Sequence, residues 1–152
     1  MRIPPHLLKD WLPPLIWMLV IFSASGDVAS TRHSAGLFAP LVHWLLPQLS
    51  PQRIEELHYL FRKCCHLSEF AVLALLLWRA IRHSHTPAQP GWLWSQAGLA
   101  LGGVLLYAAS DEFHQTFVPG RTGQVSDVIV DLGGGAIGLG LLWLVGKLAK
   151  HW

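Results

Sequence analysis

Charge is scarce in this sequence. Of its 152 residues 13% are Asp, Glu, Lys or Arg, whereas 52% are hydrophobic; a soluble globular domain carries about 25% charged residues. A chain with so few charges cannot cover a soluble core, so much of its surface must face lipid. Its eight tryptophans agree, because indole rings favour the boundary between water and lipid. The composition predicts an all-α integral membrane protein with a single domain over residues 1–152.

Cysteines and basic runs are also scarce. Cys64 and Cys65 are adjacent and lack the paired spacing of a zinc site, so we interpret them as small helix residues. The formal net charge is +2 and no cluster of Lys and Arg could grip a phosphate backbone, so nucleic acid is not an expected partner. The oligomeric state is not predicted by any of these features.

Four apolar stretches predict four transmembrane helices, over residues 11–25, 64–81, 92–109 and 125–146. The first is shorter than the roughly 20 residues that cross a bilayer. Arg2 and Lys9 ahead of its apolar run imitate a signal peptide, but Asp10, Pro13 and Pro14 favour a retained helix. We expect a bundle of four spans.

The long loop between the first two spans is expected to carry an additional helix. Residues 36–49 are rich in leucine but are interrupted by two prolines, which indicates an interfacial or re-entrant element. Ser50 and Pro51 then fit an N-cap followed by proline at the first helical position. One helix can therefore run from Pro51 to Arg82, and its first half should stand at or above the interface.

Basic residues predict the orientation. They precede the first span and follow the second and fourth, at Arg2, Lys9, Arg79, Arg82, Lys147 and Lys150. In a four-span protein these positions share one side, which the positive-inside rule assigns to the cytoplasm. Both termini are expected in the cytoplasm, with the two longer loops outside it.

Two pairs of glycines have the spacing that lets helix backbones approach closely in lipid. Gly98 and Gly102 lie in the third predicted span, and Gly134 and Gly138 in the fourth. We expect both pairs to mark helix contacts, although glycine is also common in membrane helices that make no such contact.

Acidic residues lie where a membrane protein can least tolerate them. Five of the nine fall within or at the mouth of the predicted spans: Glu69, Asp111, Glu112, Asp127 and Asp131. An ionisable side chain in hydrocarbon costs about 2.5 kcal/mol or more. These side chains are therefore expected to face inward, pair with cations or line water.

Helical spacing places the polar residues on shared faces. In the second span, intervals of four, four and three align His58, Arg62, His66 and Glu69. This stripe stops at Glu69, which indicates a cavity open at the outer end. Asp127 and Asp131 lie one turn apart in the fourth span, and Asp111, His114 and Gln115 share a face after the third.

Several motifs resemble the VanZ-like family. They are Phe22-Ser23-Ala24-Ser25, Arg62 to Phe70, Ser110-Asp111-Glu112-Phe113-His114-Gln115, Pro119-Gly120-Arg121-Thr122-Gly123, and Asp127 to Gly135. The motifs follow one another in order, and the resemblance covers most of the chain from residue 15 to 145. The resemblance implies a multi-pass protein of the bacterial plasma membrane, in a family without a firmly established reaction. Its founding member is associated with low-level resistance to the glycopeptide antibiotic teicoplanin.

One hypothesis is an enzyme that hydrolyses or transfers a group on a lipid-linked or anionic amphiphilic substrate at the outer face. The candidate catalytic residues are His66, Glu69, Asp111, Glu112 and His114. The candidate substrate-binding residues are Arg62, Gln115, Arg121, Asp127, Asp131, Ser23 and Ser25. Neither serine sits in a GxSxG elbow.

The same residues support other hypotheses. A divalent metal could lie between His66, Glu69, Asp111 or Glu112, and His114, but the spacing matches no standard site, so we expect no cofactor. A binder of lipid head groups, a cell-wall precursor or an antibiotic's target would need no nucleophile. Ion transport is disfavoured because the polar stripe ends midway. Alternatively, pairs such as Arg62 with Glu69, or Arg121 with Asp127 or Asp131, could be structural ion pairs.

Overall fold

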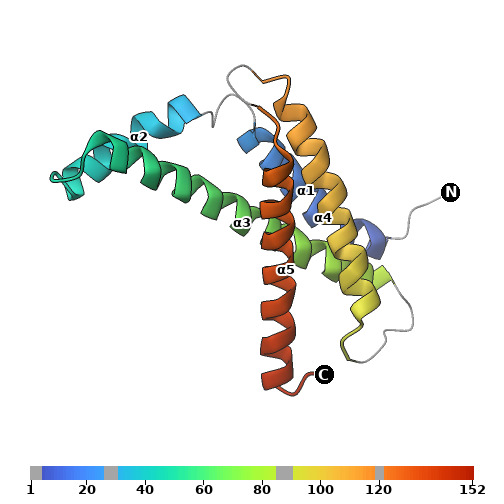
Figure 1. The fold of residues 1–152 in the computed structure, drawn as a ribbon. Helices are drawn as coiled ribbons and strands as arrows, with labels where there is room; N and C mark the ends of the chain where they lie inside the picture. The colour runs from blue at the N-terminus through green and yellow to red at the C-terminus, as the bar shows by residue number, and fades with distance from the viewer. Residues whose placement is uncertain (1–4, 26–30, 85–90, 119–121) are drawn as a thin grey trace.

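The computed structural model of the chain describes residues 5–25, 31–84, 91–118 and 122–152. Within these residues the chain is all-helical and has no strand, as predicted. The five helices are α1 (Pro5–Ser25), α2 (Thr31–Leu45), α3 (Pro51–Ser84), α4 (Trp94–Gln115) and α5 (Val125–Leu148). α1, α3, α4 and α5 pack together, whereas α2 contacts α3 at the end that projects away from the other helices (Figure 1).

Each of the four predicted spans overlaps one of the four long helices among the described residues. α3 and α5 are long and apolar enough to cross a membrane by length and composition. α1, of 21 residues, contains the first predicted span, whereas α4, of 22 residues, begins two residues after the start of the third. The chain is therefore a helical protein with membrane-spanning character.

α3 is one uninterrupted helix of 34 residues, as the sequence predicted. At its start the backbone N–H of Ile54 donates to the carbonyl oxygen of Ser50 at 3.1 Å, and the N–H of Arg53 faces the Ser50 hydroxyl at 3.4 Å. At a rise of 1.5 Å per residue the helix is about 51 Å long, more than the thickness of a hydrocarbon core. Its first half leaves the bundle together with α2 (Figure 1).

α2 begins at Thr31, five residues before the helical segment expected from the sequence, and includes Pro40. It packs on α3 through Phe38, whose ring centroid lies 5.1 Å from that of His58 and 5.3 Å from that of Phe61. His58 is buried by this contact, so the first residue of the polar stripe faces α2 and not the bundle.

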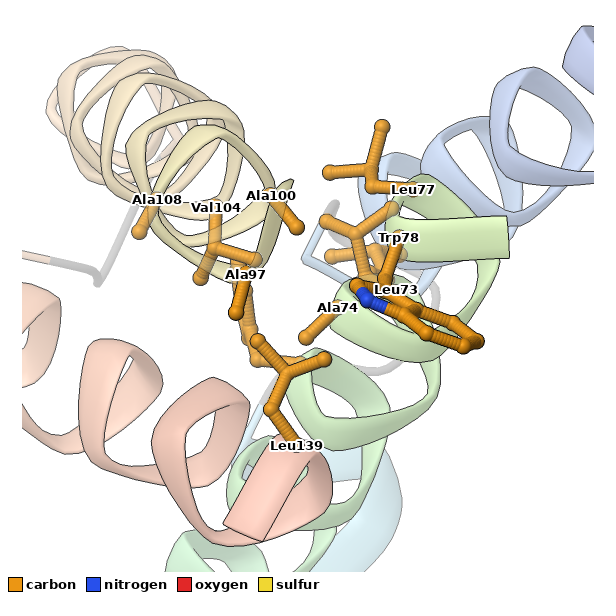
Figure 2. Close-up of a cluster of buried hydrophobic side chains, with 11 residues drawn as sticks. Leu73, Ala74, Leu77, Trp78, Ala97, Ala100, Val104, Ala108 and Leu139 are labelled. Carbon is orange, nitrogen blue, oxygen red and sulfur yellow. The ribbon is translucent and has the colours of Figure 1, made fainter. Parts of the chain in front are cut away.

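The apolar core lies where α3, α4 and α5 meet (Figure 2). α3 contributes its larger side chains, whereas the facing positions of α4 are small. The labelled residues are Leu73, Ala74, Leu77 and Trp78 of α3, Ala97, Ala100, Val104 and Ala108 of α4, and Leu139 of α5. Small residues on α4 let the two helices approach closely, which aligns their ends.

The glycines of α5 create its contact with α3. A side chain at Gly134 would collide with the backbone of Leu67, and one at Gly138 would collide with that of Ala71. The predicted close contact is confirmed for this pair. It is wrong for Gly98 and Gly102, where a side chain would meet no atom of the described residues within 4 Å. Those two glycines face outward because α4 packs through its alanine face.

One end of the bundle gathers the start of α1, the end of α3 and the end of α5. The Asp10 carboxylate lies 3.0 Å from the His83 ring and 3.7 Å from the Arg79 guanidinium. Trp152 lies beside Trp78, with ring centroids 6.3 Å apart. Arg79, Arg82 and Lys147, which the sequence assigns to the cytoplasmic side, therefore share one end of the described structure, whereas Arg2 lies outside the described residues.

Candidate functional site

The opposite end of the bundle gathers polar side chains from four helices. α1 contributes Ser25, α3 contributes Lys63 and His66, and the end of α4 and the start of α5 contribute acids. Three contacts join the helices in pairs: Ser25 to Asp111, Lys63 to Asp127, and His66 to Asp131. The acids come together because the start of α5 packs against the end of α4, where the residue before α5, Gln124, hydrogen-bonds to Glu112.

Asp111 is fixed by two hydrogen-bond donors. The Ser25 hydroxyl donates to its Oδ2 at 2.7 Å, and the Gln115 amide nitrogen donates to the same oxygen at 2.9 Å. Ser25 and Asp111 each expose 2% of their surface. The contact spans 86 residues of sequence, so it ties the end of α1 to the end of α4. One carboxylate oxygen, Oδ1, is left for another partner.

Glu112 holds the start of α5. Its Oε2 accepts a 2.8 Å hydrogen bond from the backbone N–H of Gln124, the residue before the first turn of α5. The neighbouring Gly123 lies so close to the Glu112 carbonyl that any side chain there would collide with it. This close approach requires glycine and brings the first turn of α5 against the last turns of α4.

Asp131 and His66 are paired across the contact between α5 and α3. Asp131 Oδ1 lies 3.5 Å from His66 Nδ1, an ion-pair distance that is too long for a well-formed hydrogen bond. Asp131 exposes 1% of its surface. The charge of Asp111 acts on both His66 and Asp131, so the three side chains interact electrostatically.

Lys63 belongs to this site, although the sequence analysis did not select it. Its Nζ lies 2.5 Å from Asp127 Oδ1, and both side chains are partly exposed. Lys63 precedes His66 by three residues, and Asp127 precedes Asp131 by four. The two ion pairs therefore lie one helical turn apart along the contact between α3 and α5. The spacing of about one turn in both helices is the sequence signal that could have identified Lys63.

Several buried polar atoms in the site have no hydrogen-bond partner among the described residues. They are both oxygens of Asp131, Oδ1 of Asp111, Oε1 of Glu112, and the Nδ1 atoms of His66 and His114. Buried polar atoms in folded proteins are nearly always hydrogen-bonded, and exceptions mark sites that meet water, an ion or a ligand. Four of these atoms are carboxylate oxygens, which only accept hydrogen bonds.

Some predicted site residues lie beside the cluster. The ring of His114 stacks on that of Phe22, with centroids 4.1 Å apart. Glu69 lines a groove of about 400 Å³ beside Trp17, whose indole N–H donates to the Glu69 carbonyl oxygen at 2.8 Å. The charge of Glu69 nevertheless acts on His66. Ser23 is exposed, and its hydroxyl donates to the Leu19 carbonyl of the same helix.

Of the two predicted arginines, the structure describes Arg62 but not Arg121. Arg62 is half-buried, and its charge acts on His58 and Cys65. Arg121 lies outside the described residues. The side chains brought together by the fold are therefore Ser25, Lys63, His66, Asp111, Glu112, Gln115, Asp127 and Asp131.

This arrangement is suited to exchanging protons and to accepting hydrogen bonds from a ligand. The His66–Asp131 pair can give or take a proton, and Asp111 and Glu112 each keep one oxygen free of hydrogen bonds within the described residues. In the part of the chain that the structure describes, no group of three or more His, Cys, Asp or Glu side chains is arranged to hold a metal ion.

Comparison with protein families places these features in context. The family model described as VanZ/LLP1 matches residues 11–146, which include every helix end of the site. Neither the comparison with curated proteins nor that with solved structures found a match.

Proposed function

Because the chain belongs to the VanZ/LLP1 family, we propose that it is a multi-pass protein of the bacterial plasma membrane in which α1, α3, α4 and α5 each cross the bilayer. Each of these helices has at least 21 residues, which is about 30 Å or more at 1.5 Å per residue. α2 has 15 residues and exposes Leu37 and Trp44, which suits a helix lying at the interface or re-entering the membrane.

In this proposal both termini face the cytoplasm and the acidic site faces outward. The support is the basic end of the bundle, where Arg79 of α3 lies beside Asp10 of α1. Labelling of single cysteines in a variant lacking Cys64 and Cys65 tests the orientation. A membrane-impermeant maleimide on intact cells should label Q124C, whereas K150C should react only after permeabilisation. The reverse labelling pattern would reject the orientation.

The proposed activity is hydrolysis or group transfer on a lipid-linked or anionic amphiphilic substrate of the cell envelope. The observation that carries it is the convergence of Asp111, Glu112 and Asp131 beside His66. These charges are buried at the end of a membrane bundle, where they are costly unless they serve a purpose. The substrate's reacting group would lie beside the His66 ring, which Asp131 faces at 3.5 Å.

In the proposed reaction the residues of the site have different roles. His66, oriented by Asp131, acts as the general base or acid, and Glu112 is the second proton donor or acceptor. Asp111 is a positioning carboxylate, because Ser25 and Gln115 already hold it. His114 and Glu69 lie at the edge of the site, where they would contact the substrate.

A second candidate is a binder without catalysis, which would hold a lipid head group, a cell-wall precursor or an antibiotic's target. The position of Ser25 favours it, because its hydroxyl donates to a carboxylate and not to a histidine. A serine in this contact is not activated as a nucleophile by the pattern of Ser–His pairs. The binder would use the same buried carboxylates.

One experiment separates the two candidates. The full chain, H66A and the control S95A, at the exposed start of α4, are purified, and each is incubated with a lipid extract of the cell envelope that is analysed by mass spectrometry. For an enzyme, the wild type and S95A should consume one lipid species and H66A should not. For a binder, a lipid should copurify with all folded variants and no species should be consumed. If no lipid is consumed or copurified, the proposed function is rejected.

The resemblance to a teicoplanin-resistance protein makes altered glycopeptide susceptibility part of the proposal. Cells that express the wild-type chain should tolerate more teicoplanin than cells that express H66A at the same membrane level. Equal tolerance of the two strains would remove antibiotic resistance from the proposal without affecting the lipid site.

A further inference from the structure

Among the described residues, the carboxylate cluster has more acidic side chains than basic ones: it contains four acids and the two basic side chains of Lys63 and His66. Four acids, Asp111, Glu112, Asp127 and Asp131, lie at this end of the bundle. Lys63 pairs with Asp127, which leaves three buried acids beside His66 among the described residues. An anionic group placed among these acids would be repelled, whereas a cation would be attracted.

The hydrogen-bonding capacity of the cluster also favours a cation that donates hydrogen bonds. Asp131 has two oxygens without a hydrogen bond, and Asp111 and Glu112 have one each, all within the described part of the chain. These three residues expose 1%, 2% and 5% of their surface, so bulk water does not satisfy them. A carboxylate oxygen accepts hydrogen bonds, and an ammonium group offers three donors and no acceptor.

Apolar side chains border the acids on the outside. Phe113 and Phe117 follow the acids of α4, and their rings pack edge to face at 5.2 Å. Val125 and Ile129 flank Asp127 on α5, and all four of these apolar residues are exposed. A ligand with its polar head among the acids would therefore lay an apolar tail along these residues.

We propose that the cluster binds the primary ammonium group of an amphiphile, whatever charge the rest of its head group carries. This inference rests on the proposed lipid-binding function and specifies the chemistry that the site recognises. Asp131 is the main acceptor, because it is the most buried acid and both its oxygens lack hydrogen bonds among the described residues. Asp111 and Glu112 complete the acceptor set from α4.

The test compares lipids that differ only in the ammonium group. The purified full chain in detergent is titrated with phosphatidylethanolamine, with its N-acetylated form of the same acyl chains, with phosphatidylglycerol and with free ethanolamine. Binding is followed by native mass spectrometry. A buried charge-assisted hydrogen bond changes affinity by about tenfold or more, so phosphatidylethanolamine should bind at least about tenfold more tightly than its N-acetylated form.

Variants localise the effect. D131N should lose most of this preference while still binding lipid. S95A should keep it in full, because Ser95 is exposed at the start of α4, at the opposite end of the bundle. If D131N does not fold, E112Q provides the second test and should reduce the preference. Equal binding of the amine and its N-acetylated form would overturn the proposal. A preference that survives in both folded variants would overturn it as well.

The remaining outcomes separate this inference from the proposed function. If phosphatidylglycerol binds best and D131N alters that binding, the lipid site stands and the ammonium specificity is wrong. If free ethanolamine binds as tightly as the lipid, the site recognises an amine but not an amphiphile, and this proposal fails. If none of these lipids binds, the ammonium proposal fails, and the incubation with the envelope lipid extract then decides the proposed function.

Discussion

Asp131 of α5 faces His66 of α3 across 3.5 Å, one turn of α5 above the point where Gly134 touches the backbone of Leu67. A close backbone contact between the two helices therefore lies one turn from their most buried charged pair. Because α5 cannot move away from α3 without losing that contact, the carboxylate is kept beside the histidine ring.

Replacement of Asp131 by asparagine should leave the fold intact and remove most of the preference for an ammonium head group. The carboxylate has no hydrogen bond among the described residues, and asparagine has nearly the same shape without the buried charge. The free energy of unfolding should change by no more than about 1 kcal/mol. Thermal unfolding in detergent measures it. A loss of about 3–5 kcal/mol would indicate instead that the pair is a structural ion pair.

The two serines near the end of α1 provide a matched comparison. Ser25 donates to the buried Asp111, whereas Ser23 is exposed and bonds within its own helix. S25A should destabilise the protein by about 1–3 kcal/mol, because a buried carboxylate loses a donor, and S23A should have almost no effect. Thermal unfolding of both variants checks this. Equal effects would show that the contact between α1 and α4 is unimportant.

Alanine at Gly134 should separate α5 from α3. A methyl group there would collide with the backbone of Leu67, whereas at Gly133 it would meet no described atom within 4 Å. G134A should cost about 1–3 kcal/mol, the usual range for overpacking, and should weaken ligand binding as well. G133A is the control and should behave as wild type. The prediction fails if the two variants have the same thermal stability.

The Lys63–Asp127 pair should contribute modestly, because both side chains are partly exposed at 21% and 29%. K63Q and D127N should each destabilise the protein slightly, and the double variant should lose less than the sum of the two. The coupling energy from this double-mutant cycle should be about 1 kcal/mol or less. It should fall at high salt, because screening weakens partly exposed pairs. A coupling that is independent of salt would contradict this account.

The sequence by itself determined the helical class and the long, unbroken α3. Sparse charge required lipid as a solvent, and Ser50 with Pro51 marked the start of α3. Helical periodicity also predicted that Asp127 and Asp131 share a face, because side chains one turn apart must do so. The contact at Gly134 and Gly138 followed from their spacing, and it is present.

Only the tertiary structure decided which helix each face meets. His58, His66 and Glu69 form one stripe in the sequence, yet they lie against α2, α5 and α1 respectively. Periodicity also could not distinguish Gly134, which touches α3, from Gly98, which faces outward. In a membrane, lipid and a neighbouring helix are equally apolar, so the sequence pattern of a buried face matches that of a lipid-facing one. The partner of each face depends on how all the helices pack together.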